Sequence, residues 1–339
     1  MLYSEKFNVH ECFGLLKSKK SNGKISSKEL DISQLEINGD TIISLCGNDT
    51  KDPMRAETYA RYCFNWLKNY KNAEDLEVYS VFYKKGKPLI NVSTVNPLFD
   101  YYELAKTLFN PIIKAQSADL GLENLCGKLE KTVFFGHSIG GHVMNELMNE
   151  LGKLLQENGY SHNDIRNIYS KIVFIGYSPY SLVKAPINEI CIAPIYDSMG
   201  SAQLVYNKVH KGKQGKSSDP RILEARKIRD GAHTNFIKSY KTVTENADIL
   251  FYLNGNSLYA TPNLLFNDGL AEDHNLVGVI NYENRNNLQT PAGSKTSQFI
   301  SRVFESALSV DRQKFSLDEI FDAEVKLLKL EDQERGKEI

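Results

Sequence analysis

A serine flanked by glycines follows a short apolar run near the middle of the chain. Residues 132–143 read TVFFGHSIGGHV, in which Gly136 and Gly140 stand two positions before and after Ser138. A buried strand that turns at once into a helix, with glycines at these positions, places a serine hydroxyl on a sharp turn above a sheet edge. The N–H groups of the helix behind that serine suit a developing oxyanion. The pattern therefore predicts Ser138 as the nucleophile of an acyl-transfer reaction.

Two other glycine-rich turns are excluded by single residues. A phosphate-binding loop needs GxxxxGK[ST], and His142 stands where that motif requires lysine. A dinucleotide-binding turn needs glycine at position 138, which is serine. Neither nucleotide nor phosphate binding is therefore expected at this turn.

An oxyanion hole needs two N–H donors near the nucleophile. The first expected donor is the N–H of Ile139, the residue after Ser138. The second comes from the loop after the apolar run 41–46, where Gly47 lets the backbone approach the substrate and Asn48 supplies the N–H. An ordinary turn is the alternative interpretation of this loop.

The motif GHSIGG after a predicted strand resembles the α/β-hydrolase superfamily, whose lipases and esterases commonly carry GHSxGG. The resemblance covers about residues 38–285 in the order of elements; it is specific at the elbow and loose elsewhere. It implies a mostly parallel central sheet flanked by helices on both faces. It also implies a triad in the chain order serine, acid, histidine.

The general base implied by the resemblance is a histidine after the last strand. His274, in the stretch Glu272-Asp273-His274-Asn275-Leu276, stands at that place, and His233 is the alternative. His137 is expected to pack beside the nucleophile or line the pocket, and His142 to lie on a face of the elbow helix.

The acid is less defined. Many members of the superfamily carry it in a Gly-x-x-Asp turn after the penultimate strand, but this chain has Asn256 where the aspartate would stand. Class 3-type lipases use the end of the strand one earlier, which favours Asp197. A helix cap or turn at Asp197 remains open, and Asp268 is the next candidate acid. The missing aspartate at 256 also leaves open a binding scaffold that has lost catalysis.

The rest of the chain supplies the elements that must position these residues. Strands are predicted from apolar runs at 41–46, 78–83, 132–135, 172–175, 190–195 and 248–253, and helices from periodic runs at 56–70, 101–116 and 139–156. Strands alternating with amphipathic helices predict an α/β fold with a mostly parallel sheet.

The domain organisation follows from composition. Residues 1–35 are expected to form an N-terminal extension in which the polar stretch 17–30 is a loop or linker. Residues 36–300 form the predicted hydrolase domain, with a lid insertion expected at 204–245. Residues 301–339 form a C-terminal helix and charged tail, with a capping box that begins at Ser316.

Composition limits the partners. Lys and Arg total 41 against 42 for Asp and Glu, which argues against nucleic-acid binding by bulk electrostatics. Five cysteines without a CxxC pair predict reduced, buried thiols. Since no HExxH or clustered Cys/His set occurs, no metal or organic cofactor is expected. The oligomeric state is left open.

Location and substrate are the least constrained features. Without a signal peptide or an apolar run of about 18 residues, a cytoplasmic location is expected. The Lys-, Asn- and Ile-rich composition and Glu-rich end are similar to effectors that bacteria export through type IV secretion. The expected substrate is a carboxylic ester of a small molecule or lipid, with thioester hydrolysis and acyl transfer as alternatives. The basic stretch 211–219 would suit peripheral contact with an anionic membrane surface.

Overall fold

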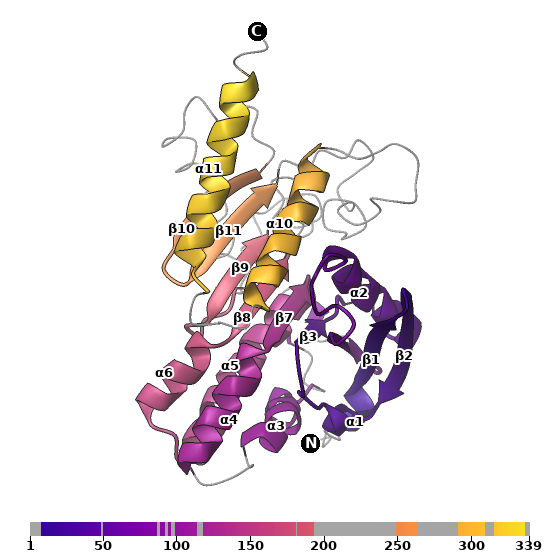
Figure 1. Cartoon of the computed structure of the whole chain (residues 1–339). Helices are drawn as coiled ribbons and strands as arrows, with labels where there is room; N and C mark the ends of the chain where they lie inside the picture. Colours follow the sequence, from indigo (N-terminus) through magenta and orange to yellow (C-terminus); the bar gives the residue numbers. More distant parts are fainter. Residues whose placement is uncertain are drawn as a thin grey trace, which may run out of the picture.

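A mixed sheet forms the centre of the molecule (Figure 1). The computed structural model describes residues 8–48, 50–86, 89–91, 94–95, 99–113, 118–180, 182–192, 249–262, 291–308 and 315–335. Within them the sheet has nine strands in the order β10-β11-β9-β8-β7-β3-β4-β1-β2. Their bounds are Phe13–Ser21 (β1), Lys24–Leu30 (β2), Thr41–Leu45 (β3), Glu77–Tyr83 (β4), Thr132–His137 (β7), Val173–Tyr177 (β8), Asn188–Ile192 (β9), Ile249–Asn254 (β10) and Ser257–Pro262 (β11). A separate short hairpin joins β5 (Leu89–Asn91) to β6 (Thr94–Val95).

The predicted mostly parallel sheet is confirmed. The strands from β4 through β3, β7, β8 and β9 to β11 run parallel, whereas β1, β2 and β10 pair antiparallel with their neighbours. The carboxyl ends of the parallel strands therefore lie at one edge of the sheet. Ligand sites of open α/β sheets form outside this edge.

Helices cover both faces of the sheet, as the sequence predicts. One face packs against α2 (Pro53–Trp66), α10 (Pro291–Ala307) and α11 (Leu317–Arg335). The other packs against α3 (Tyr101–Ile113), α4 (Ala118–Glu130), α5 (Ile139–Glu157) and α6 (His162–Ser170). Because alternate strand residues point to opposite faces, Phe134 joins one core while Val133 and Phe135 join the other.

The loop or linker predicted over residues 17–30 is wrong, because most of this segment lies in β1 and β2. Part of the expected N-terminal extension thus belongs to the sheet. Asn22 and Gly23 form the turn between the two strands with φ of 50° and 74°, the backbone that an Asn-Gly hairpin favours. Lys17 and Lys19 pair with Glu77 of β4. On the edge strand β2, Lys24 and Lys28 are exposed, and lysines that face solvent at a sheet edge prevent edge-to-edge pairing. These lysines give the segment its linker-like composition.

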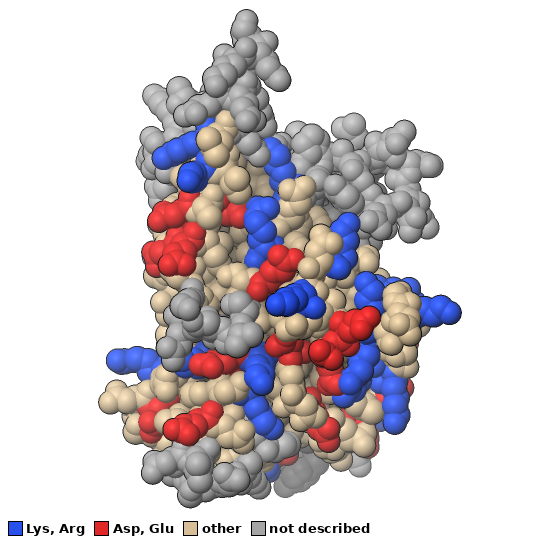
Figure 2. Space-filling view, viewed as in Figure 1, with Lys and Arg blue, Asp and Glu red and all other residues tan. Residues whose placement is uncertain are grey.

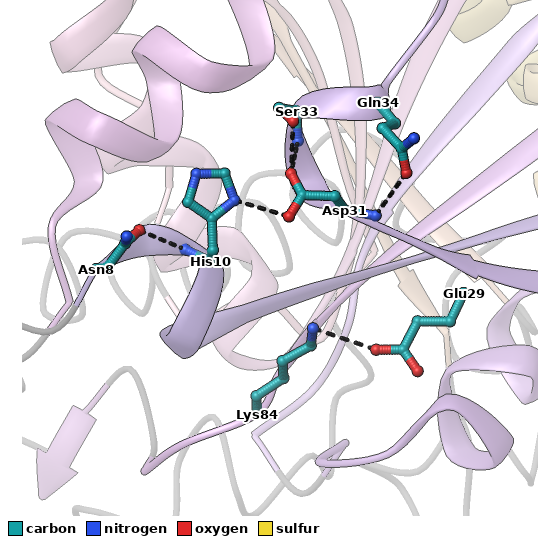
Figure 3. Close-up of polar contacts among 7 residues, drawn as sticks. All are labelled: Asn8, His10, Glu29, Asp31, Ser33, Gln34 and Lys84. Atoms are coloured by element: carbon teal, nitrogen blue, oxygen red, sulfur yellow. Dashed lines mark hydrogen bonds and ion pairs between the residues drawn. The ribbon is translucent and has the colours of Figure 1, made fainter.

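The N-terminal segment is fixed by a small polar cluster (Figure 3). Asn8 caps the short helix α1 (Val9–Cys12), and Asp31 caps the 3-10 helix η1 (Ile32–Gln34). His10 Nδ1 lies 2.9 Å from Asp31 Oδ2, which ties the two segments together. The hydrogen bond from Ser33 is the main cause of the lowered pKa of the Asp31 carboxyl.

The C-terminal helices belong to the same body as the sheet. Ser316 accepts the N–H of Glu319 at 3.3 Å, so the predicted cap of α11 is present. Arg302 of α10 donates two hydrogen bonds, of 2.8 and 2.7 Å, to Glu324 of α11. Both helices contact β10 and β11, so this segment covers one end of the sheet.

The thiols and the surface are consistent with the composition. All five cysteines are buried and none of them forms a disulfide, which confirms the prediction of reduced, buried thiols. On the face drawn in Figure 2, acidic and basic side chains lie side by side over the described elements. None of the described helices is long and apolar enough to cross a bilayer.

Candidate active site

Ser138 occupies a strained turn between β7 and α5. Its φ of 54° and ψ of −114° lie outside the regions that residues with a Cβ normally adopt. Its N–H donates to Tyr177 O at 3.1 Å, and its carbonyl accepts the N–H groups of Tyr180 at 2.7 Å and Gly141 at 3.2 Å. These bonds hold the strained backbone in place, and the residue is half-buried.

The two flanking glycines are required by close packing. A Cβ at Gly140 would overlap the carbonyl oxygen of Leu45 on β3 and lie 3.1 Å from its carbonyl carbon. A Cβ at Gly136 would lie 2.7 Å from the ring of Phe174 on β8. The strand and the helix can therefore meet at Ser138 only without side chains at these two positions.

The start of α5 presents backbone N–H groups directly after Ser138. Ile139 is the first residue of α5, and Ser138 makes no side-chain cap. The N–H of Ile139 is thus among the four that a helix leaves without an intrahelical acceptor. The positive end of the helix dipole also lies here and favours negative charge. This arrangement is compatible with the predicted role of Ile139 as an oxyanion donor.

The loop of residues 46–50, called here the oxyanion loop after the role that the sequence predicts for it, follows β3 at the same edge of the sheet, and all of it except Asp49 is described. Cys46 N–H donates to Val81 O at 3.1 Å, and Thr50 N–H donates back to Gly47 O at 3.1 Å. Gly47 N–H donates to the hydroxyl of Tyr59 at 2.8 Å, so this N–H is not available to an oxyanion. Asn48 is half-buried, and its role as the donor of this loop stays a prediction.

The histidine before the nucleophile is anchored by a tyrosine. His137 Nδ1 lies 2.9 Å from the hydroxyl of Tyr59, and the His137 side chain also packs against the Tyr177 ring. Burial raises the pKa of the Tyr59 hydroxyl above its ordinary value, so that this hydroxyl stays protonated. His142 is fully buried on α5, with its ring edge-on to Tyr101. Nothing in the sequence pattern indicated Tyr59, which only appears as one member of a buried helical stripe.

The predicted base and acid lie outside the described residues. This holds for His274, Asp197, Asp268 and the alternative base His233. What the structure does place are the strand ends that precede them. The register aligns His137 with Tyr177, Tyr177 with Ile192, and Ile192 with Ala260. The strands β9 and β11 therefore end at the edge where Ser138 lies, and Asp197 and His274 come after them in the sequence.

The turn that carries Asn256 is not an acid position, which corrects the sequence analysis. Gly255, with φ of 57°, and Asn256 form the two-residue turn between β10 and β11. Glu189 N–H donates to Asn256 O at 2.9 Å, which places the turn at the amino end of the parallel strands. Along the strand direction, the turn lies five residues from Ser138, or roughly 17 Å. The absence of an aspartate at 256 therefore has no bearing on the triad, and the argument for a lost catalytic function loses its support.

Two observations concern the rest of the described chain. No group of three His, Cys, Asp or Glu side chains among the described residues could hold a metal ion. A cavity of about 150 Å³ lies between β10, α10 and α11, with Phe251 and Arg302 in its lining. None of its lining residues belongs to the elbow.

No protein-family model and no curated protein matches the sequence. Among solved structures, the chain is similar to EstE1, a thermophilic and thermostable carboxylesterase cloned from a metagenomic library. The identity is 12% and the TM-score 0.35, over 86% of this chain and 88% of that one. A likeness at this level says nothing about chemistry, which depends on the residues around Ser138.

Proposed function

We propose that this protein is a serine hydrolase that cleaves a carboxylic ester through an acyl-enzyme intermediate on Ser138. The observation that carries the proposal is the strained backbone of Ser138 between a buried strand and the N-terminus of α5. Strain of this kind, which costs about 1–3 kcal/mol, persists where the surrounding structure enforces it and is concentrated at functional sites. The hydrogen bonds to Tyr177 and Tyr180 and the contact with Leu45 enforce it here.

The proposed mechanism assigns one role to each residue. Ser138 Oγ attacks the carbonyl carbon, and His274 accepts the hydroxyl proton and passes it to the leaving alcohol. Asp197 orients His274 and stabilises its charged form. The N–H groups of Ile139 and Asn48 stabilise the oxyanion. Water activated by His274 then releases the acid and regenerates Ser138.

The substrate class is a carboxylic ester of a small molecule or a lipid. The same triad would cleave a thioester or transfer the acyl group to another acceptor, because all these reactions pass through the same acyl-enzyme. Peripheral contact with a membrane surface is part of the lipid version of the proposal.

The test is hydrolysis of p-nitrophenyl esters of increasing chain length by the wild type and three variants. Ser138→Ala and His274→Ala should abolish turnover, and Asp197→Ala should reduce it strongly. If Asp268→Ala has the larger effect, the acid is Asp268. A wild type that is inert on every ester and thioester, or a Ser138→Ala variant with full activity, would refute the proposal.

A further inference from the structure

A buried tyrosine on α2 joins the two segments that frame the nucleophile. The Tyr59 hydroxyl accepts the N–H of Gly47 at 2.8 Å and lies 2.9 Å from Nδ1 of His137. Gly47 belongs to the oxyanion loop, and His137 directly precedes Ser138. Since Tyr59 is only 8% exposed, its hydroxyl interacts with these groups and not with solvent.

The contact between Gly47, the Tyr59 hydroxyl and His137 leaves no room for an added side-chain carbon. A Cβ at Gly47 would lie 2.7 Å from the Tyr59 hydroxyl and 2.9 Å from His137 Nδ1. The loop, the hydroxyl and the imidazole are therefore in direct packing contact as well as hydrogen-bonded. The Tyr59 hydroxyl thus holds the amino-terminal end of the segment that carries Asn48.

The opposite side of the loop is held by the end of β4. The Tyr83 hydroxyl donates to Cys46 O at 2.8 Å, and Tyr83 N–H donates to Thr50 O at 3.0 Å. Between these anchors lies Asn48, which is half-buried and whose side-chain oxygen is buried. Of the two tyrosines, Tyr59 is the one whose hydroxyl also contacts His137, the residue directly before Ser138.

We propose that Tyr59 is a positioning residue for the oxyanion hole, which fixes the N–H of Asn48 relative to Ser138 through its bonds to Gly47 and His137. The inference rests on the proposed function. Tyr59 does not touch the substrate; it acts through the loop and the elbow. Its removal should therefore weaken the stabilisation of charge on the substrate oxygen while leaving substrate binding largely intact.

This role predicts a specific kinetic signature. The oxyanion exists only along the reaction path, so a misplaced donor lowers kcat more than it changes KM. Sulfur is a weaker hydrogen-bond acceptor than oxygen, so an intact hole accelerates an oxygen ester more than the matching thionoester, in which C=S replaces C=O. A displaced loop should reduce this preference, whereas a loss of stability alone should not.

The experiment compares Tyr59→Phe with Tyr169→Phe. Tyr169 is equally exposed, at 8%, and its hydroxyl donates to Met148 O at 2.7 Å between α6 and α5, away from the elbow. Tyr59→Phe should lower kcat on the oxygen ester by about 10- to 100-fold, part of the loss seen when an oxyanion donor is removed. Its KM should change little and its ratio of ester to thionoester rate should fall. Tyr169→Phe should keep the wild-type kcat and ratio.

A second pair of variants decides the question if Tyr59→Phe does not fold. His137→Asn retains a side-chain oxygen that can accept the Tyr59 hydroxyl, and His137→Leu does not. His137→Asn should therefore keep more of the kcat and of the rate ratio than His137→Leu.

The outcomes separate the inference from the proposed function. An active wild type that needs Ser138, with the ratio unchanged in Tyr59→Phe or equal in both His137 variants, would overturn the inference alone. A wild type without ester or thioester turnover would overturn the proposed function and the inference with it.

Discussion

The substitution Gly140→Ala tests the close contact that shapes the elbow. The added methyl would overlap the carbonyl oxygen of Leu45 and lie 3.1 Å from its carbonyl carbon. Carbon atoms pack at about 3.5–4.0 Å, so the start of α5 must withdraw from β3 by about 0.5–1 Å. The obstacle is backbone of a central strand, which pairs with β4 and β7. Rotation of a side chain therefore cannot relieve the clash.

The displacement has two expected costs. Overpacking should lower the free energy of unfolding by about 1–3 kcal/mol. The shift also moves Ser138 and the N–H of Ile139 relative to the oxyanion loop. A misplacement of about 1 Å can cost about 100-fold in rate. The variant should therefore lose most of its kcat/KM while it remains folded.

Urea unfolding and ester hydrolysis measure these two quantities, with Gly127→Ala as the matched control. Gly127 also lies in a helix, α4, and a Cβ there would meet nothing within 4 Å. Gly127→Ala should raise stability by about 0.5–1 kcal/mol, because alanine loses less backbone entropy on folding, and should keep full activity. A Gly140→Ala variant as stable and as active as the wild type would refute the packing argument.

Three further predictions concern ionised groups. Burial raises the pKa of the Glu189 carboxyl to about 8 from 4.5. The folded protein then keeps a proton that the unfolded chain has lost, and stability falls as the pH rises between these values. The free energy of unfolding of Glu189→Gln, measured by chemical unfolding, should rise relative to that of the wild type by up to about 5 kcal/mol as the pH goes from about 4 to about 9. A difference that stays constant with pH would contradict this. Burial also acts to raise the pKa of Glu77, but hydrogen bonds from two lysines and a tyrosine outweigh it and leave the pKa lowered. Its stabilisation is present above the ordinary Glu pKa and is lost as the pH falls through the folded value. Glu77→Gln should thus lower the free energy of unfolding at neutral pH, and this loss should fade toward about pH 3. An equal loss of stability at both pH values would count against this reasoning. Arg302→Ala leaves Glu324, 6% exposed, without its bidentate partner. Because solvent screens the half-exposed arginine in part, Arg302→Ala should lower the free energy of unfolding by only about 1–2 kcal/mol, and it should speed amide exchange in α11. Arg61→Ala, which breaks an exposed pair on one helix, should cost under about 0.5 kcal/mol; equal effects would refute the role of the buried carboxylate.

The central strands were predictable because burial on both faces leaves a continuous apolar run. Residues 132–135 and 172–175 are examples, and the structure places them in β7 and β8. The helix over 139–156 was predictable from its single apolar stripe. The edge hairpin was missed because its lysines face solvent, although its Asn22-Gly23 turn is a hairpin signal. β11 was also missed, because it begins directly after a two-residue turn and contains a polar first residue.

In the candidate site, too, some residues could be predicted from the sequence and others could not. Ser138 and its glycines could be found because their spacing is local and a steric requirement fixes it. Tyr59 could not, because its contact with His137 spans 78 residues and depends on how α2 packs on the sheet. The acid position at Asn256 was misplaced because sequence order does not show that β10 runs antiparallel. That direction puts the turn at the opposite end of the sheet from Ser138.

The most direct test of the central claim is the site of labelling by a fluorophosphonate. Ser178 provides the matched control, since it also has a positive φ, of 45°, at the end of the neighbouring strand β8, but no helix begins after it. The proposal predicts one phosphonyl group per wild-type chain, mapped by peptide mass spectrometry to Ser138. Labelling should be lost in Ser138→Ala and kept in Ser178→Ala. An unlabelled wild type, or a label that persists in Ser138→Ala, would contradict the assignment of Ser138 as the nucleophile.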